Sequence, residues 1–224
     1  MEEPMATQSN ERIEQEPSAT HVPDRRTGDV RRQELVHAAY MAIAEQGFEG
    51  LRTRNVAERA GVNIATLHYY FATKEDLIRG VVDYIERQFA EQHARLWVQG
   101  ETARGQLHAE LWHAVEIKRD RPELQIVLLA LFQRSLRDPA IHAIVKGMDS
   151  GWHRTIMEMV RAGIAEGSFR ANLDVDATAS AIIAFIKGAS IQLAREPETF
   201  AYERVVAEFE RWLSVGVEGG NTSR

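Results

Sequence analysis

The chain has 224 residues, enough for one large domain or two small ones, and its lack of cysteine excludes disulfides, zinc–thiolate sites and thiol catalysis. With 44% hydrophobic and 27% charged residues it has a globular composition, and its net charge of -6 argues against nucleic-acid binding over the whole surface. Residues 1–23 carry a net charge of -4, whereas residues 24–80 carry +1. Any DNA contact is therefore expected from a local patch near the N-terminus.

Residues 1–29 contain three prolines and little apolar material, which predicts a flexible tail. Four arginines (Arg25, Arg26, Arg31 and Arg32) cluster where this tail meets the first helix. Two interpretations stay open for them, a solvated basic stretch or an arm that touches DNA. No hydrophobic signal segment and no apolar run of about 18 residues is evident, so we expect a cytoplasmic protein without a membrane span.

Helix signals dominate from residue 30 onward. The first helix is expected to end at Gly47, and a short helix to run from Thr53, as a potential N-cap, to Ala60. Asn63 can cap a second short helix that ends at Phe71, and Thr73 can cap a helix that continues to about Trp97. Five more helices are predicted at 104–118, 122–136, 138–166, 175–195 and 199–215. With no convincing strand pattern, the predicted fold class is all-α.

Residues 53–71 form two short helices joined by a tight turn at Gly61, which is the pattern of a helix-turn-helix. At 100° per residue, one face of the second helix carries Leu67, Tyr70 and Phe71 and is expected to face the core. The opposite face carries Ile64, Ala65, His68 and Tyr69, with Thr66 on the rim. Small apolar, hydroxyl and aromatic side chains suit thymine methyl groups, base edges and phosphates, so this face predicts DNA contact.

Residues 53–77 read TRNVAERAGVNIATLHYYFATKEDL, and this stretch resembles the signature of TetR-type transcriptional regulators. With the preceding helix the resemblance covers about residues 30–90. It implies an N-terminal three-helix DNA-binding domain, a helical ligand-binding and dimerisation domain, and repression relieved by a small molecule. It also implies that Thr53 and Lys74 hold phosphates and that residues 63–66 probe bases.

The family usually has tyrosine where this chain has His68, so the contact made from this position is expected to differ. Ile64 and Ala65 are weak hydrogen-bond partners, so base readout is expected to use DNA shape and the flanking Arg52 and Arg54. The complete expected DNA-binding set is Arg52, Thr53, Arg54, Asn63, Ile64, Ala65, Thr66, His68, Tyr69 and Lys74.

The second domain is expected to span residues 91–216, followed by a disordered tail at 217–224. The helix at 175–195 places small residues on one face, which allows another helix to approach closely, and the next helix is amphipathic. Together they predict a symmetric four-helix homodimer interface, with burial inside the monomer as the alternative. The candidate interface residues are Ala177, Ala181, Ala184, Gly188, Val205, Phe209 and Trp212.

A partly apolar small-molecule effector is expected in the same domain, because aromatic and methionine side chains line apolar cavities well. The same side chains also fill ordinary cores. The candidate pocket residues are Trp97, Trp112, His113, Glu116, Phe132, Trp152, Met159 and Phe185.

Two other functions were considered. The pairs Glu34…His37 and Glu110…His113 have the spacing of di-metal helical-bundle enzymes, but Glu34 and His37 belong to the DNA-binding module. A helical interaction module that does not bind DNA is the second alternative. The sequence favours a regulator that is not an enzyme and that needs no metal or cofactor.

Overall fold

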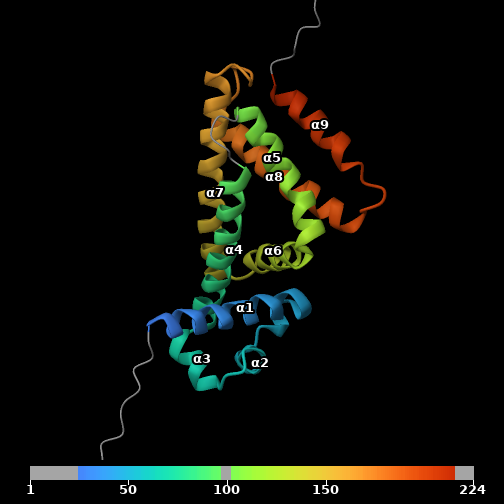
Figure 1. Cartoon of the computed structure of the whole chain (residues 1–224). Helices are drawn as coiled ribbons and strands as arrows, with labels where there is room; N and C mark the ends of the chain where they lie inside the picture. Colours follow the sequence, from blue (N-terminus) through green and yellow to red (C-terminus); the bar gives the residue numbers. More distant parts are fainter. Residues whose placement is uncertain (1–24, 97–101, 215–224) are drawn as a thin grey trace, which may run out of the picture.

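A computed structural model describes residues 25–96 and 102–214 (Figure 1). Within these ranges the chain forms nine α-helices and one isolated antiparallel bridge between Phe169 and Ser214. The all-α prediction is therefore confirmed. The helices are α1 (Arg25–Gly50), α2 (Thr53–Arg59), α3 (Ile64–Tyr70), α4 (Lys74–Leu96), α5 (Ala103–Asp120), α6 (Pro122–Ser135), α7 (Pro139–Ala165), α8 (Val175–Arg195) and α9 (Tyr202–Leu213).

Two helix starts differ by more than one residue from the predicted ones. Helix α1 already begins at Arg25, inside the segment predicted as a tail. Helix α9 begins at Tyr202 and not at 199, because a turn comes first, in which the amide of Phe200 donates to the carbonyl of Glu196 at 2.9 Å. Gly47 interrupts α1 with φ 65°, in agreement with its predicted role as a helix stop.

Helices α1, α2 and α3 form a compact head at one end of the molecule, and α4 leads from this head into the body (Figure 1). Leu67 and Phe71 are fully buried in the head, and the guanidinium of Arg32 lies 4.9 Å from the centre of the Phe71 ring. Arg59 of α2 donates two hydrogen bonds, of 2.9 and 2.5 Å, to the carboxylate of Glu45 in α1. These contacts hold the two short helices against α1.

The core of the head continues into the body. Buried residues of α1–α4 belong to the same hydrophobic cluster as Leu124 and Val127 of α6 and Ile141 and Val145 of α7. Figure 1 shows α6 lying along α1. One hydrophobic core thus continues across the boundary that was predicted at residue 90.

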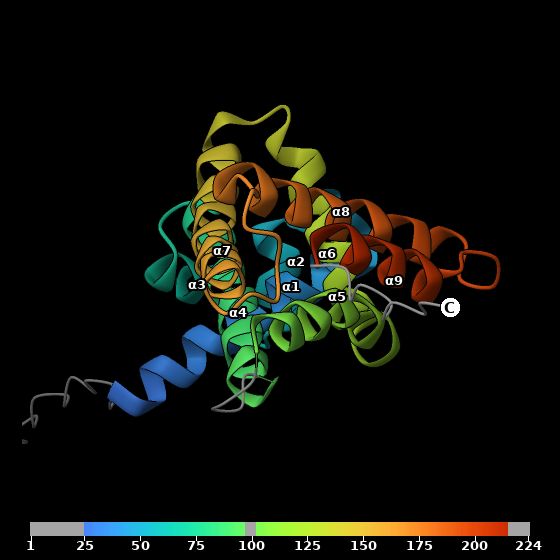
Figure 2. The ribbon, with the colours of Figure 1, turned by 90° about the horizontal axis from the view of Figure 1, so that it is seen from above.

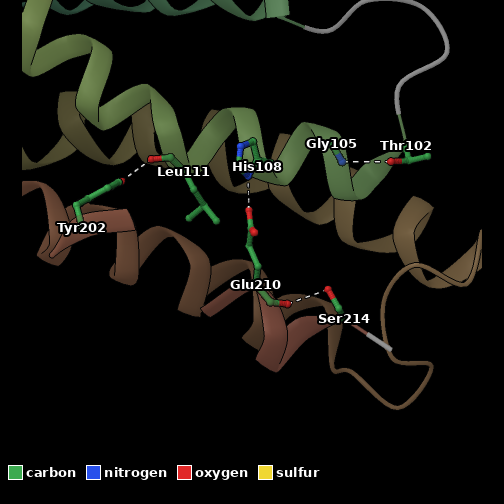
Figure 3. Close-up of polar contacts among 7 residues, drawn as sticks. All are labelled: Thr102, Gly105, His108, Leu111, Tyr202, Glu210 and Ser214. Atoms are coloured by element: carbon green, nitrogen blue, oxygen red, sulfur yellow. Dashed lines mark hydrogen bonds and ion pairs between the residues drawn. The ribbon is translucent and has the colours of Figure 1, made fainter. Parts of the chain in front are cut away.

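A second core joins α5, the later part of α7, α8 and α9. Nδ1 of His108 in α5 lies 2.8 Å from Oε1 of Glu210 in α9, and the hydroxyl of Tyr202 donates to the carbonyl of Leu111 (Figure 3). Burial raises the pKa of Tyr202 above its usual range, so the hydroxyl stays a neutral donor. Helix α9 is thus attached to α5 (Figure 2).

Helix α8 is long and apolar enough to cross a membrane by length and composition, which corrects the expectation that no apolar run of this length exists. No other helix in the described ranges passes this test, and less than half of the most apolar stretch of α8 is buried. Its hydropathy comes from core residues such as Ile182 and Ile183 together with outward alanines. The inner side of α8 packs in the second core, and its outer side is exposed within the described residues.

Candidate nucleic-acid interface and effector cavity

Helix α3 begins at a side-chain cap after a glycine turn. Gly61 has φ 65°, a conformation that favours glycine, and lies in the turn between α2 and α3. Oδ1 of Asn63 accepts hydrogen bonds from the backbone amide of Thr66 at 2.8 Å and from its hydroxyl at 3.0 Å. The predicted cap is confirmed. Because the cap uses the side-chain oxygen of Asn63, only the amide NH₂ of this residue is left to contact a DNA base.

The two faces of α3 lie as the helical spacing predicts. Leu67 is buried, whereas Ile64, Ala65 and His68 are exposed. Tyr69 is 77% exposed, and its ring meets that of Tyr70 edge-on with 5.1 Å between the centroids. The outward face of α3 is thus an apolar and aromatic surface with no covering element within the described residues.

Basic side chains lie at the starts of the neighbouring helices. Arg52 and Arg54 are exposed at the start of α2, and Arg54 lies 3.8 Å from Glu58. Thr53 is the first helical residue of α2 and not its cap, because Arg52 occupies the cap position, so its hydroxyl is not used for capping α2. Lys74 is exposed at the start of α4. This position is fixed by reciprocal hydrogen bonds of 3.0 and 3.1 Å between Thr73 and Asp76.

The basic cluster before the head is partly engaged by the head itself. Arg31 donates a 2.7 Å hydrogen bond to Glu34, and Arg32 lies over Phe71. Arg25 and Arg26 belong to α1, but their side chains lie outside the described part of the structure. Two of the four arginines thus have contacts within the head, and contact with DNA stays a prediction for all four.

The body contains a cavity of about 300 Å³ with mainly apolar walls. Helices α4, α5, α6, α7 and α8 all contribute to its lining, so it lies between the helix that leads to the head and the helix with the outward alanine face. The lining includes Glu86, Phe89, Glu110, His113, Gln125, Leu129, Phe132, Met148, Asp149, Trp152, Lys187 and Ile191.

Charged side chains in the wall of this cavity are fixed by hydrogen bonds and an ion pair. Glu110 is only 4% exposed, and its Oε1 accepts a 2.6 Å hydrogen bond from the indole nitrogen of Trp152. Nζ of Lys187 lies 2.9 and 2.8 Å from the two carboxylate oxygens of Asp149. The pocket therefore combines aromatic walls with fixed charges, which suits a small amphipathic molecule.

Three of the predicted pocket residues line the cavity, namely His113, Phe132 and Trp152. Trp97 lies outside the described residues. Glu116 is half-buried but does not line the cavity.

The other predicted pocket residues have structural roles and correct the expectation. Met159 is buried in the second core. Trp112 packs between His108 and Tyr202, with ring centroids 5.7 and 6.2 Å away. Phe185 stacks on Phe209 with 4.0 Å between the centroids, so it points toward α9. Side-chain type alone could not separate these core positions from the cavity wall.

Sequence reasoning missed the cavity residues Asp149 and Lys187, and it noticed Glu110 only as part of a metal-binding spacing. Asp149 and Lys187 pair across 38 positions of the chain, and no local pattern signals such a pair. Within the described ranges no group of three or more His, Asp or Glu side chains is arranged to hold a metal ion. The Glu110…His113 pair belongs instead to the cavity wall.

The predicted dimer surface is open in the single chain. Ala177, Ala181, Ala184 and Gly188 are all exposed along one side of α8. Beside them, α9 presents Trp212, which is 58% exposed, and a shallow groove runs between Phe185 and this tryptophan. Phe209 is buried within the chain and Val205 is half-buried, so Trp212 is the main outward aromatic of α9.

Comparison with known proteins agrees with this arrangement. Residues 35–81 match the model of "Bacterial regulatory proteins, tetR family", and residues 103–215, about half of the chain, match "BetI-type transcriptional repressor, C-terminal". The chain is 26% identical over 149 residues to the HTH-type transcriptional repressor KstR2 of Mycolicibacterium smegmatis, an alignment that covers 65% of this chain and 71% of that protein.

Two further relatives extend the comparison. The HTH-type transcriptional dual regulator CecR of Shigella flexneri is 29% identical over 181 residues, covering 75% of this chain and 81% of the relative. The crystal structure of a TetR-family regulator from Rhodococcus sp. superposes with a TM-score of 0.73 at 24% identity, over 83% of this chain and all of the other. The structural likeness supports the fold.

Proposed function

The chain belongs to the TetR family of bacterial transcriptional regulators, and on that premise we propose that it represses transcription as a homodimer that leaves its operator when a small molecule binds in the body. It acts by binding and not by catalysis, and its place of action is the bacterial cytoplasm. Three features support the three parts of this proposal: the outward face of α3, the cavity between α4 and α8, and the uncovered side of α8.

The outward face of α3 is the observation that carries the proposal. An exposed tyrosine, an exposed isoleucine and an alanine on a short helix are unfavourable in water but favourable against thymine methyl groups in a major groove. Exposed Arg52, Arg54 and Lys74 at the neighbouring helix starts supply positive charge for phosphates. The pairing of an apolar reading face with flanking cations fits a helix-turn-helix on DNA.

The cavity supports the regulatory part. Glu86 and Phe89 in its wall belong to α4, which leads into the head, and Phe132 belongs to α6, which packs along α1. A ligand that fits one arrangement of α4 and α6 better than another shifts the population toward it. If that arrangement sets the two heads at a spacing that mismatches the operator, DNA affinity falls, typically about 5–150-fold.

The uncovered side of α8 supports the dimer. Small outward residues let the same helix of a second copy approach closely, and the groove between Phe185 and Trp212 offers a further place for side chains of that copy. A dimer is also what DNA recognition requires, because two recognition helices read half-sites about 34–36 Å apart or a multiple of that distance.

The test is a selection of DNA from a random-sequence pool with the full-length protein. We expect a palindromic or pseudo-palindromic site to be enriched, and the dimer to bind it far more tightly than scrambled DNA of equal length. A folded dimer that enriches no sequence would overturn the proposal and would favour a helical interaction module.

A further inference from the structure

An ammonium group already occupies a cage of aromatic rings and a carboxylate inside the cavity. Nζ of Lys187 lies 4.4 Å from the centre of the Phe132 ring and 5.9 Å from that of Trp152. On another side it contacts both oxygens of Asp149, at 2.9 and 2.8 Å. The occupant comes from α8, the rings from α6 and α7, and the carboxylate from α7.

This cage has the features of a cation site and not only of an ion pair. Aromatic faces attract ammonium groups through the ring quadrupole, and the attraction is greatest where the cation has lost part of its water. The indole of Trp152 is fixed by its 2.6 Å hydrogen bond to Glu110. The rings are thus positioned by the fold, and the lysine supplies the charge on a flexible stem.

The charge of the cavity wall also favours a cation. Its lining contains three acidic side chains, Glu86, Glu110 and Asp149, whereas Lys187 is its one lysine or arginine. Partial burial, helped by the nearby carboxylate of Asp83, raises the pKa of Glu86. An anionic ligand would add to this charge, whereas a cation would offset it.

We propose that the effector is an amphipathic organic cation whose charged group takes the place of the Lys187 ammonium between Asp149, Phe132 and Trp152. Its apolar body would lie against Phe89 and Leu129. Lys187 is the internal competitor: when it leaves, the link between α7 and α8 through Asp149 is broken. That the ligand acts as an effector rests on the proposed function, whereas the cation site itself does not.

Calorimetry with three probes of similar shape tests this proposal: (p-hydroxyphenyl)trimethylammonium, the uncharged p-tert-butylphenol and the anionic p-tert-butylbenzoate. For the full-length protein at neutral pH we expect the cation to bind at least about tenfold more tightly than the uncharged probe, the size of one cation–π or ion-pair contribution. The anion should bind most weakly.

Substitutions in the cage test whether Lys187 competes with a bound cation. Lys187→Met removes the competitor and should tighten binding of the cation about tenfold while leaving the uncharged probe unchanged. Asp149→Asn should weaken binding of the cation by a similar factor. Lys146→Met, an exposed lysine of α7 outside the cavity wall, should change neither. If Lys187→Met does not fold, Lys187→Gln replaces it.

Several outcomes would overturn the proposal. The first is that the cation binds no better than the uncharged probe to either the wild-type protein or the Lys187→Met variant. The second is that the Lys187→Met variant binds the cation more weakly than the wild type does. The third is that the wild type prefers the anion and that the Lys187→Met variant loses this preference. The same preparations are tested on the selected DNA. Sequence-selective DNA binding without cation preference rejects only the cation site, whereas cation preference without DNA binding rejects only the proposed function.

Discussion

A Cβ atom added to Gly80 of α4 would lie 3.2 Å from the ring of Phe71, the residue that follows α3. The same atom would lie 2.9 Å from a methyl group of Val36 in α1. Gly80 thus allows α4 to approach the base of the recognition helix and α1 at once. This close contact sets how the head is mounted on the helix that leads to the cavity.

Gly80→Ala should therefore destabilise the protein by about 1–3 kcal/mol, because the methyl group overpacks a buried contact. Chemical denaturation measures this change. Gly147→Ala in α7 is the matched control, since nothing lies within 4 Å of an added Cβ there. In a helix interior alanine is favoured over glycine by up to about 1 kcal/mol, so the control should be neutral or stabilising. Equal effects of both substitutions would contradict the close contact.

Asn63 offers a way to separate helix capping from DNA contact. Asn63→Ser keeps a side-chain acceptor for the amide of Thr66, so its free energy of unfolding should stay within about 0.5 kcal/mol of the wild-type value. Asn63→Ala loses the acceptor and should lower the free energy of unfolding by about 1 kcal/mol. Because the asparagine oxygen is used by the cap, only its NH₂ is left for DNA. Asn63→Ser should therefore lower operator affinity by less than about tenfold. A serine variant as unstable as the alanine variant would contradict the cap.

Trp212 should carry much of the dimer affinity, since large aromatic side chains in well-packed interface pockets dominate binding. Trp212→Ala is expected to weaken the dimer at least about tenfold, corresponding to 1.4 kcal/mol or more. Sedimentation over a concentration series measures it. Leu136→Ala removes a side chain that is 83% exposed between α6 and α7, and it should leave association unchanged. If the tryptophan variant dimerises like the wild type, the interface lies elsewhere.

The ion pair between Glu45 and Arg59 predicts a pH dependence of stability. The hydrogen bonds from Arg59 lower the pKa of Glu45 below its ordinary value of 4.5. A lowered carboxyl pKa contributes stability that is present above the ordinary value and is lost as the pH falls through the lowered one. Glu45→Gln should remove this acid-dependent part of the thermal midpoint measured from neutral pH downward.

Glu58→Gln serves as the control for that experiment. Glu58 lies 3.8 Å from Arg54 with both side chains largely exposed, and such pairs contribute little. An acid dependence that persists in Glu45→Gln and disappears in Glu58→Gln would contradict the assignment.

Local patterns in the sequence predicted the head well. The cap at Asn63, the stop at Gly47 and the burial of Leu67 all follow from interactions within a few residues of each other. Thr53 shows the limit, because it was predicted as the cap of α2 and the helix starts one residue earlier than that role requires, with Arg52 at the cap position. Helical spacing also predicted that Ala181 and Gly188 share one face of α8, and both are exposed in the single chain.

The cavity could not be predicted to the same extent. Helix α5 is covered on two sides, with Leu111 and His108 toward α9 and Glu110 and His113 toward the cavity, so its periodicity does not say which face meets a ligand. Phe185 and Lys187 lie on nearly opposite sides of α8, and helical spacing alone does not say that one side meets α9 and the other the cavity. Such assignments depend on how distant helices cross, which no local pattern contains.

The affinity of the dimer for its selected site at two salt concentrations, with and without Thr53→Ala and Lys74→Ala, tests the central claim most directly. We expect tight, sequence-selective binding that weakens steeply with salt, because phosphate contacts release counterions. The double variant should lose most of that affinity while remaining a folded dimer. Unchanged affinity in the double variant, or binding that ignores sequence, would contradict recognition of DNA by α3 and the helix starts beside it.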